Sequence, residues 1–390
     1  MVPSGMLKRE VNSRSGPTDI FGGCDPSSTE RTIERALKGL RSKEGSTVDI
    51  RVLFTVSRKC NIIFMSESVT AAVASPQARS MVPPLSALPD VLPTDRLNER
   101  GMPTRELRDS LREIPNVRNA FTVLGVLAQS FGVVIAAAWV NTWWAYLIAF
   151  VLMARGHVCL SIISHEAAHR ILFSNRLIND GVGRWLTAYP TFLPLLQYRR
   201  VHFAHHRDEL GPDEPDMAYY AGYPIPRDSW HRKLTRDLVG ISAYKNFGGL
   251  FRAARKRQRE ALQILAVQIV MLGVSIAFMR PLAYVVWVLS WATLWRVSNR
   301  ARAIAEHGGM ERSRDRRVTT HVIRQSRLAR YWIVPYNTGW HLAHHADMAV
   351  PWRNLPKLHD ELVRSGWVTP EIEYPSYWAF WRAASSGPPR

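Results

Sequence analysis

Long apolar segments are the feature that most constrains how this chain can fold. A helix needs about 20 predominantly apolar residues to cross the hydrocarbon core of a bilayer. The chain contains two pairs of such segments, and only two residues separate the members of each pair. We therefore predict four membrane spans in two helical hairpins, the last extending to about Val297. The apolar segments are residues 120–140, 143–164, 261–279 and 282–295.

The distribution of charge predicts how these spans are oriented. The 390 residues are 46% hydrophobic, yet the formal net charge is +19. Arginine and lysine concentrate before residue 120, in the loop 166–260 and after Arg300. Since cytosolic loops carry the excess of basic residues, both termini and the central loop are predicted to be cytosolic. The basic runs flank the spans, so we expect them to meet anionic lipid and not nucleic acid.

The N-terminal quarter differs in composition from the rest. It is rich in Ser, Pro, Arg and Thr, and only residues 30–45 suggest a short amphipathic helix. We expect residues 1–100 to be a disordered or non-native extension, residues 101–370 to form the membrane domain, and residues 371–390 to be a C-terminal tail. Cys24, Cys60 and Cys159 are widely separated, so neither a disulfide framework nor a cysteine metal site is predicted.

The histidines carry the strongest chemical signal. Of the 13 histidines, eight fall in three short motifs: HEAAH (165–169), HFAHH (202–206) and HLAHH (341–345). Residues three or four apart share a helix face, so each motif presents at least two imidazoles in one direction. Imidazole suits zinc, copper, iron and nickel. Eight histidines are too many for one ion and suit two. The remaining isolated histidines, His157, His231, His321 and His359, are predicted to face solvent.

Two other functions are compatible with part of this pattern. HEAAH (165–169) matches the zinc metalloprotease motif, in which two histidines bind zinc and the glutamate acts as base. That function leaves both HxxHH motifs unexplained. A metal transporter or storage protein is the other alternative. A transporter requires ionisable residues deep inside its spans, and here only Arg155 and His157 lie in one, near its end.

The three motifs, with helical hairpins between them, resemble the histidine boxes of the membrane fatty acid desaturase superfamily. The stretch HRDELGPDEPD (206–216) is similar to the acidic segment that follows the second box there, and residues 337–362 are similar to the third-box region. The resemblance covers about residues 100–370. It implies an all-α integral membrane fold, with about four transmembrane helices and a cytosolic helical cap that carries the boxes.

The resemblance also implies a centre of two iron ions that uses O2. The eight box histidines carry over as iron ligands, and His307 is the candidate for a ninth. Asn337 is a candidate to hold a water at the metal, and Glu166, Asp208 and Asp216 are candidates to orient imidazoles through their ring N–H groups. The proposed ligands are His165, His169, His202, His205, His206, His341, His344, His345 and His307.

The expected function is the introduction of a double bond into a lipid acyl chain. A lipid or carotenoid hydroxylase or ketolase of the same superfamily is the alternative. No heme-binding HPGG sequence or iron–sulfur cysteine set occurs in the chain, so two electrons for each turnover must come from an external donor. We expect a ferredoxin or a cytochrome b5-like protein with its reductase, steered by the basic cytosolic face.

Overall fold

A computed structural model describes residues 80–388. The predictions for residues 1–79, including the helix at 30–45 and the states of Cys24 and Cys60, lie outside the described residues. The described part is mostly helical, as the sequence predicts, and its strands are one parallel pair of two residues each. β1 (Val322–Ile323) pairs with β2 (Glu373–Tyr374). This pairing joins the segment that precedes the third histidine motif to the C-terminal part of the chain.

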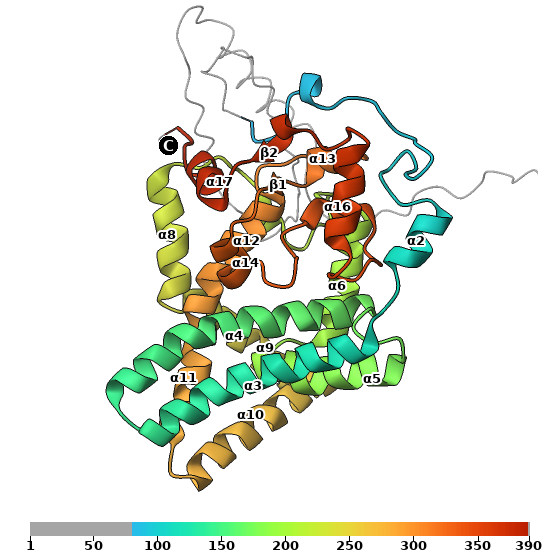
Figure 1. The fold of residues 1–390 in the computed structure, drawn as a ribbon. Helices are drawn as coiled ribbons and strands as arrows, with labels where there is room; N and C mark the ends of the chain where they lie inside the picture. The colour runs from blue at the N-terminus through green and yellow to red at the C-terminus, as the bar shows by residue number, and fades with distance from the viewer. Residues whose placement is uncertain (1–79, 389–390) are drawn as a thin grey trace, which may run out of the picture. The chain divides into compact units, whose positions relative to one another are not determined.

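The first predicted hairpin is formed by α3 (Asn116–Val140) and α4 (Trp143–His169). Asn141 ends α3 in the left-handed conformation with a φ of 51°, which turns the chain within two residues. The two helices pack side by side (Figure 1). Large apolar side chains nevertheless stay exposed on α3, including Phe121 at 71% and Trp139 at 85%. Such a surface on a long apolar helix is typical of one that faces lipid.

The second predicted hairpin is formed by α10 (Arg259–Ala277) and α11 (Pro281–Ala292). α11 also packs against α3 and α4, so the four helices form one bundle. The Arg280 guanidinium in the second turn donates to the carbonyl of Ala138 at the end of α3 through its Nε atom, at 2.8 Å. The two tight turns therefore lie at the same end of the bundle.

Three described helices are long and apolar enough to cross a membrane: α3, α4 and α10. α11 has 12 residues, which corresponds to about 18 Å, well short of a bilayer core of about 30 Å. The chain bends at Thr293 and continues as α12 (Leu294–His307), whose polar side chains depart from the apolar pattern of α11. The fourth span thus remains a prediction that depends on the first turns of α12.

The histidine motifs lie at the other end of α4 from its turn. HEAAH forms the end of α4, HFAHH lies in α6 (Leu195–Arg207), and HLAHH forms α15 (His341–Ala346). The other helical segments are η1 (Leu85–Ala87), α2 (Arg105–Leu111), α5 (Arg176–Gly181), η2 (Val182–Ala188), η3 (Tyr189–Thr191), α7 (Met217–Tyr220), α8 (Arg227–Leu238), α9 (Ile241–Arg255), α13 (Arg316–Thr319), α14 (Arg327–Trp332), α16 (Leu355–Arg364), η4 (Pro370–Ile372) and α17 (Tyr377–Ala384).

The ordered domain extends beyond both predicted boundaries. Residues 80–100 pack on it, with Leu97 only 1% exposed and Arg96 paired with Glu361 at 2.8 Å. At the other end, α17 buries Phe380 completely in a cluster that includes Ile304. The described residues 80–100 and 371–388 therefore contribute a few buried apolar side chains to the domain.

Candidate metal centre

Local backbone geometry brings the first pair of histidines to the end of α4. Arg170 adopts a left-handed conformation with a φ of 62°, and its N–H bonds to the carbonyls of Glu166 and Ala167, which terminates the helix. His165 and His169 lie one turn apart immediately before this stop, both buried. The four-residue spacing therefore places two imidazoles on one helix face.

The two HxxHH motifs divide their histidines between two clusters. His202 and His206 of α6 join the HEAAH pair, as does His344 of α15. His205 of α6 points instead to a second group with His341 and His345 of α15. Each HxxHH pentapeptide thus contributes histidines to both groups, which explains why the motif occurs twice in the chain. His307, at the end of α12, completes the second group.

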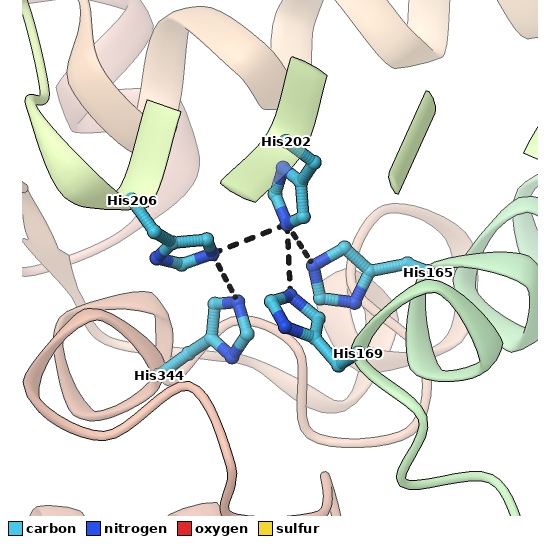
Figure 2. Close-up of side chains that lie close together, drawn as sticks. All are labelled: His165, His169, His202, His206 and His344. Carbon is cyan, nitrogen blue, oxygen red and sulfur yellow. Dashed lines mark hydrogen bonds between the residues drawn. The ribbon is translucent and has the colours of Figure 1, made fainter. Parts of the chain in front are cut away.

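Cluster A consists of His165, His169, His202, His206 and His344, whose rings converge on one point (Figure 2). The Nε2 atom of His202 lies 2.9 Å from that of His165 and 2.9 Å from that of His169. It lies 3.1 Å from Nε2 of His206, which in turn lies 3.1 Å from Nε2 of His344. All five histidines therefore turn the same ring nitrogen toward a shared centre.

Cluster B consists of His205, His307, His341 and His345. Nε2 of His341 lies 3.0 Å from that of His307 and 3.0 Å from that of His345. The rings of His205 and His307 are 4.8 Å apart between centroids. The clusters adjoin, because the rings of His206 in cluster A and His345 in cluster B are 4.3 Å apart. The structure thus brings together all eight box histidines and the predicted ninth residue, His307.

Acceptors behind cluster B fix the orientation of its rings. Nδ1 of His205 bonds to the Glu214 carboxylate at 2.7 Å, and Nδ1 of His307 donates to the Thr319 carbonyl at 2.8 Å. Nδ1 of His345 contacts Glu209. Partners of this kind select the tautomer that leaves Nε2 free for a metal. In cluster A, by contrast, the buried Nδ1 atoms of His165 and His169 have no hydrogen-bond partner among residues 80–388.

Electrostatics keep most of these imidazoles neutral. Burial, together with neighbouring imidazoles, lowers the pKa of His206, His344 and His345 well below its usual value. At His205 burial acts in the same direction, but the hydrogen bond and charge of Glu214 outweigh it and raise the pKa. A neutral imidazole offers its lone pair, which is the form that binds a metal ion.

The contacts between ring nitrogens fit metal binding better than hydrogen bonding. A neutral imidazole nitrogen either donates one proton or accepts one, so Nε2 of His202 cannot be satisfied by three other ring nitrogens at once. Two nitrogens bound at right angles to one ion, each at about 2.1 Å, lie about 3.0 Å apart. The observed separations match that value, and an all-imidazole donor set suits iron among the transition metals.

A cavity of about 270 Å³ opens beside both clusters. Its walls include His165 and His202 from cluster A and His205 and His341 from cluster B. The other walls come from residues 191–194, α7, α9, α11 and α12. A molecule in this cavity would therefore touch the surface formed by both groups of imidazoles.

Of the four polar residues that were predicted to support the histidines, Glu166 lies near a box histidine, and the other three make no hydrogen bond to an imidazole among the described residues. Asp208 pairs with Arg312 at the surface through a contact of 2.7 Å, and Asp216 lines the cavity without a hydrogen bond to an imidazole. An oxygen of Glu166 lies 3.8 Å from Nδ1 of His165, while the other accepts from the backbone N–H of Trp352. Among the described contacts, the Asn337 side chain makes none with a histidine.

Three glutamates occupy the supporting positions instead. Glu209 and Glu214 contact His345 and His205, and Glu306 lies 3.7 Å from Nδ1 of His341. Glu209 and Glu214 come from the same acidic segment that drew attention to Asp208 and Asp216. Helical spacing gives no signal for Glu209, because α6 ends at Arg207 and the partner of Glu209 is His345 on α15.

The prediction that the isolated histidines face solvent is wrong for three of the four. His157 is buried and its Nε2 lies 2.9 Å from the Trp287 carbonyl, and Nε2 of His321 lies 2.8 Å from the Gly308 carbonyl. His359 is buried and stacks on Trp340 with ring centroids 4.2 Å apart. Only His231 is exposed. The three buried rings contact residues outside both clusters, so they pack in the core without joining either cluster.

The comparison with protein families agrees with this geometry. The family profile described as "Fatty acid desaturase" matches residues 141–381, which contain all three histidine motifs and His307. The chain belongs to the fatty acid desaturase family. It is therefore an oxygen-dependent, desaturase-like oxidoreductase, and its histidine clusters could bind metal ions.

Two similar proteins are also desaturases. The dihydrorhizobitoxine desaturase of Bradyrhizobium elkanii is 24% identical over 282 residues, which cover 65% of this chain and 78% of that protein. The sn-1 acyl-lipid omega-3 desaturase (ferredoxin) of Synechocystis is 24% identical over 191 residues, which cover 48% of this chain and 49% of that protein. Their names share the reaction and differ in the substrate.

The geometry also disfavours the metalloprotease alternative. A catalytic zinc of that class needs three protein ligands and a water, whereas His165 and His169 meet three further imidazoles. The glutamate of the motif would have to act as a base at the metal. Glu166 instead directs one oxygen to the backbone of Trp352 and lies behind His165, on the side of Nδ1.

Proposed function

We propose that this protein introduces a carbon–carbon double bond into a saturated aliphatic segment of its substrate, with two irons held by clusters A and B. The reaction balances as CH2–CH2 + O2 + 2 e⁻ + 2 H⁺ → CH=CH + 2 H2O. The observation that carries the proposal is the convergence of nine imidazoles, eight buried and His202 half-buried, in two adjacent groups, in a chain of the desaturase family.

The residues present indicate which part of the reaction the irons would supply and which part the side chains perform. When bound, the irons would supply with O2 the oxidant that removes hydrogen from unactivated carbon. The chain holds the ring nitrogens in place, because Glu214, Glu209 and the Thr319 carbonyl fix the imidazoles of cluster B from behind. It also presents the cavity wall of His165, His202, His205 and His341 to the substrate.

The class of substrate and the orientation in the membrane belong to this proposal. The sequence predicts an acyl-lipid substrate, and the Synechocystis relative is named for one. Both tight turns lie at one end of the bundle and the clusters at the end where α4 stops. With the basic flanks on the cytosolic side, four spans would place the clusters in the cytosol, within reach of a soluble donor.

A basic surface next to the clusters is the proposed docking site of that donor. It is formed by Arg100, Arg207, Arg312, Arg314 and Arg316, which surround a hollow with Glu209 at its base. Arg316 pairs with Glu209 at 2.6 Å, and Glu209 contacts His345 of cluster B. An acidic electron carrier would bind there by charge complementarity, one residue away from the imidazoles. The ferredoxin named for the Synechocystis relative is the type of donor we expect.

Product analysis tests the proposed reaction against its alternative. Membranes that contain the iron-loaded protein, a donor and its reductase should yield a product two hydrogens lighter than the substrate, formed only with O2. The products should be identified by mass spectrometry. Lipid extracts from cells with the gene should be compared in the same way with extracts from cells without it. A product one oxygen heavier than the substrate would indicate hydroxylation and not desaturation. A product one oxygen heavier and two hydrogens lighter than the substrate would indicate ketolation.

A further inference from the structure

The cavity beside the clusters is more polar than a channel for a hydrocarbon chain requires. The face of α12 that lines it presents Arg296, Asn299, Arg302 and Glu306, at three- and four-residue spacings that bring them to one side of the helix. Asn246 of α9 adds a further polar group. Burying methylenes against such groups would remove water from them without supplying new hydrogen bonds, which is unfavourable.

Arg296 is the unusual member of this wall. It is only 6% exposed, and its Nε atom has no hydrogen-bond partner. Its two terminal nitrogens donate to the amide oxygen of Asn246 at 2.8 and 2.9 Å, when that amide is oriented to satisfy both. Its guanidinium lies over Trp291 and Trp295, at 4.0 and 4.7 Å from the ring centroids. All of these partners are uncharged.

The arginines that follow on the same helix are paired. Arg300 forms an ion pair with Asp237, and Arg302 pairs with Glu306 at 2.7 Å. Among the residues that the structure describes, no carboxylate lies within ion-pair distance of Arg296. Asp237, which pairs directly with Arg300, acts on Arg296 only through space. A buried guanidinium without a direct counter-ion is unfavourable, so a bound anion would stabilise this site.

We propose that Arg296 binds an anionic group, such as a carboxylate, of a compact substrate that fills this cavity beside the two clusters. The inference rests on the proposed reaction and replaces the acyl lipid that the sequence predicts with a compact acid. It places the saturated carbons of that acid at His165, His202 and His341. The planar guanidinium is suited to a carboxylate because it can donate two parallel hydrogen bonds. Trp291 and Trp295 hold its plane in place.

The size of the cavity supports a compact molecule. At about 270 Å³ it lies just below the range of about 300–1,000 Å³ for cavities that hold drug-sized ligands. An apolar groove of about 580 Å³ does exist between α3, α10 and α11, but it shares no lining residue with this cavity. A long acyl chain thus has no described apolar channel that leads to the imidazoles.

The test compares two ligands that differ only in charge, hexanoate and hexanamide. Calorimetric titration of the full iron-loaded chain in lipid nanodiscs should show hexanoate binding at least tenfold more tightly than hexanamide. Arg296→Gln should abolish this preference at unchanged iron content. Arg296→Lys, which keeps the charge and fills similar space, should retain part of it. Arg255→Gln, at an exposed position on α9, is the matched control and should behave as the unaltered chain.

The outcomes separate this inference from the proposed reaction. Equal binding of the two ligands, absence of hexanoate binding, or a preference that survives Arg296→Gln would each overturn the role of Arg296. Stearate binding as tightly as hexanoate and competing with it would overturn the compact size. These titrations involve no turnover, so either result leaves the desaturation reaction to be judged on its own products.

Discussion

At the scale of single residues, the carboxylates behind the imidazoles are the most informative positions. Glu214 touches no substrate or metal in this arrangement, and its contact with Nδ1 of His205 fixes which ring nitrogen faces cluster B. Loss of such a supporting partner typically lowers metal affinity or activity by about 10–100-fold. Glu214 is therefore a positioning residue, and its replacement should change the affinity for iron, which can be measured without turnover.

We expect Glu214→Gln to weaken iron binding by about 10–100-fold at cluster B and to leave cluster A loaded. Iron per folded chain should fall from two toward one in a competition with a chelator of known affinity. Glu311→Gln removes the same charge at an exposed position and should retain both irons. Full iron affinity in Glu214→Gln would show that His205 keeps its orientation without this carboxylate.

At the scale of elements, η2 supports the first histidine motif through close packing. Gly183 lies against α4, and a β-carbon at this position would collide with the β-carbon of Ala167, between His165 and His169. We expect Gly183→Ala to cost about 1–3 kcal/mol in folding stability. Because the strain falls on HEAAH, iron binding at cluster A should weaken as well.

The neighbouring glycine provides a matched comparison. Gly181 has open space where its β-carbon would lie, so Gly181→Ala should leave the melting temperature and iron content unchanged. Both variants can be measured by thermal unfolding in detergent and by metal analysis. Equal behaviour of the two alanine variants would mean that η2 can move away from α4 without disturbing the histidines.

The hairpin elements lead to a prediction about membrane topology. Asn141 and Met279 lie in the two tight turns, which meet through the bond of Arg280 to Ala138. In a cysteine-free background, Asn141→Cys and Met279→Cys should both react with an impermeant maleimide added outside intact cells. Arg314→Cys, on the basic surface near the clusters, should react only after the cells are opened. Labelling of the two turns from opposite sides would exclude the four-span arrangement.

At the scale of the whole molecule, the location of the positive charge determines which partner it attracts. The net charge of +19 alone predicts attraction to any anionic partner. The fold concentrates five arginines around the hollow above Glu209, close to cluster B. Exposed charges of this kind act mainly on association, and their effect fades as salt screens them.

We therefore expect Arg314→Glu to raise the KM for an acidic donor about tenfold at low salt and to have little effect on kcat. The difference should shrink as ionic strength rises, because screening removes the attraction. Arg227→Glu, an exposed arginine at the start of α8, changes the net charge equally and should leave the KM unaltered. Similar effects of both variants would assign the donor's attraction to the total charge and leave the basic surface without a specific role.

The sequence by itself determined the properties that depend on local spacing. Apolar runs predict helices long enough to span, because each residue adds a fixed rise, and three-four spacings place histidines on one helix face. Those rules suffice for α3, α4 and α10 and for the shared helix face of the histidines within each box. The family resemblance added His307, which no periodic pattern marks.

Only the tertiary structure decided which groups meet across long separations. It divided each HxxHH motif between clusters A and B, and it placed Glu209 and Glu214 behind the rings where Asp208 and Asp216 were expected. It also left Arg296 without a carboxylate while its neighbours on α12 are paired. Adjacent acidic residues are chemically equivalent in a sequence, and only the packing of distant helices determines which of them points inward and which faces solvent.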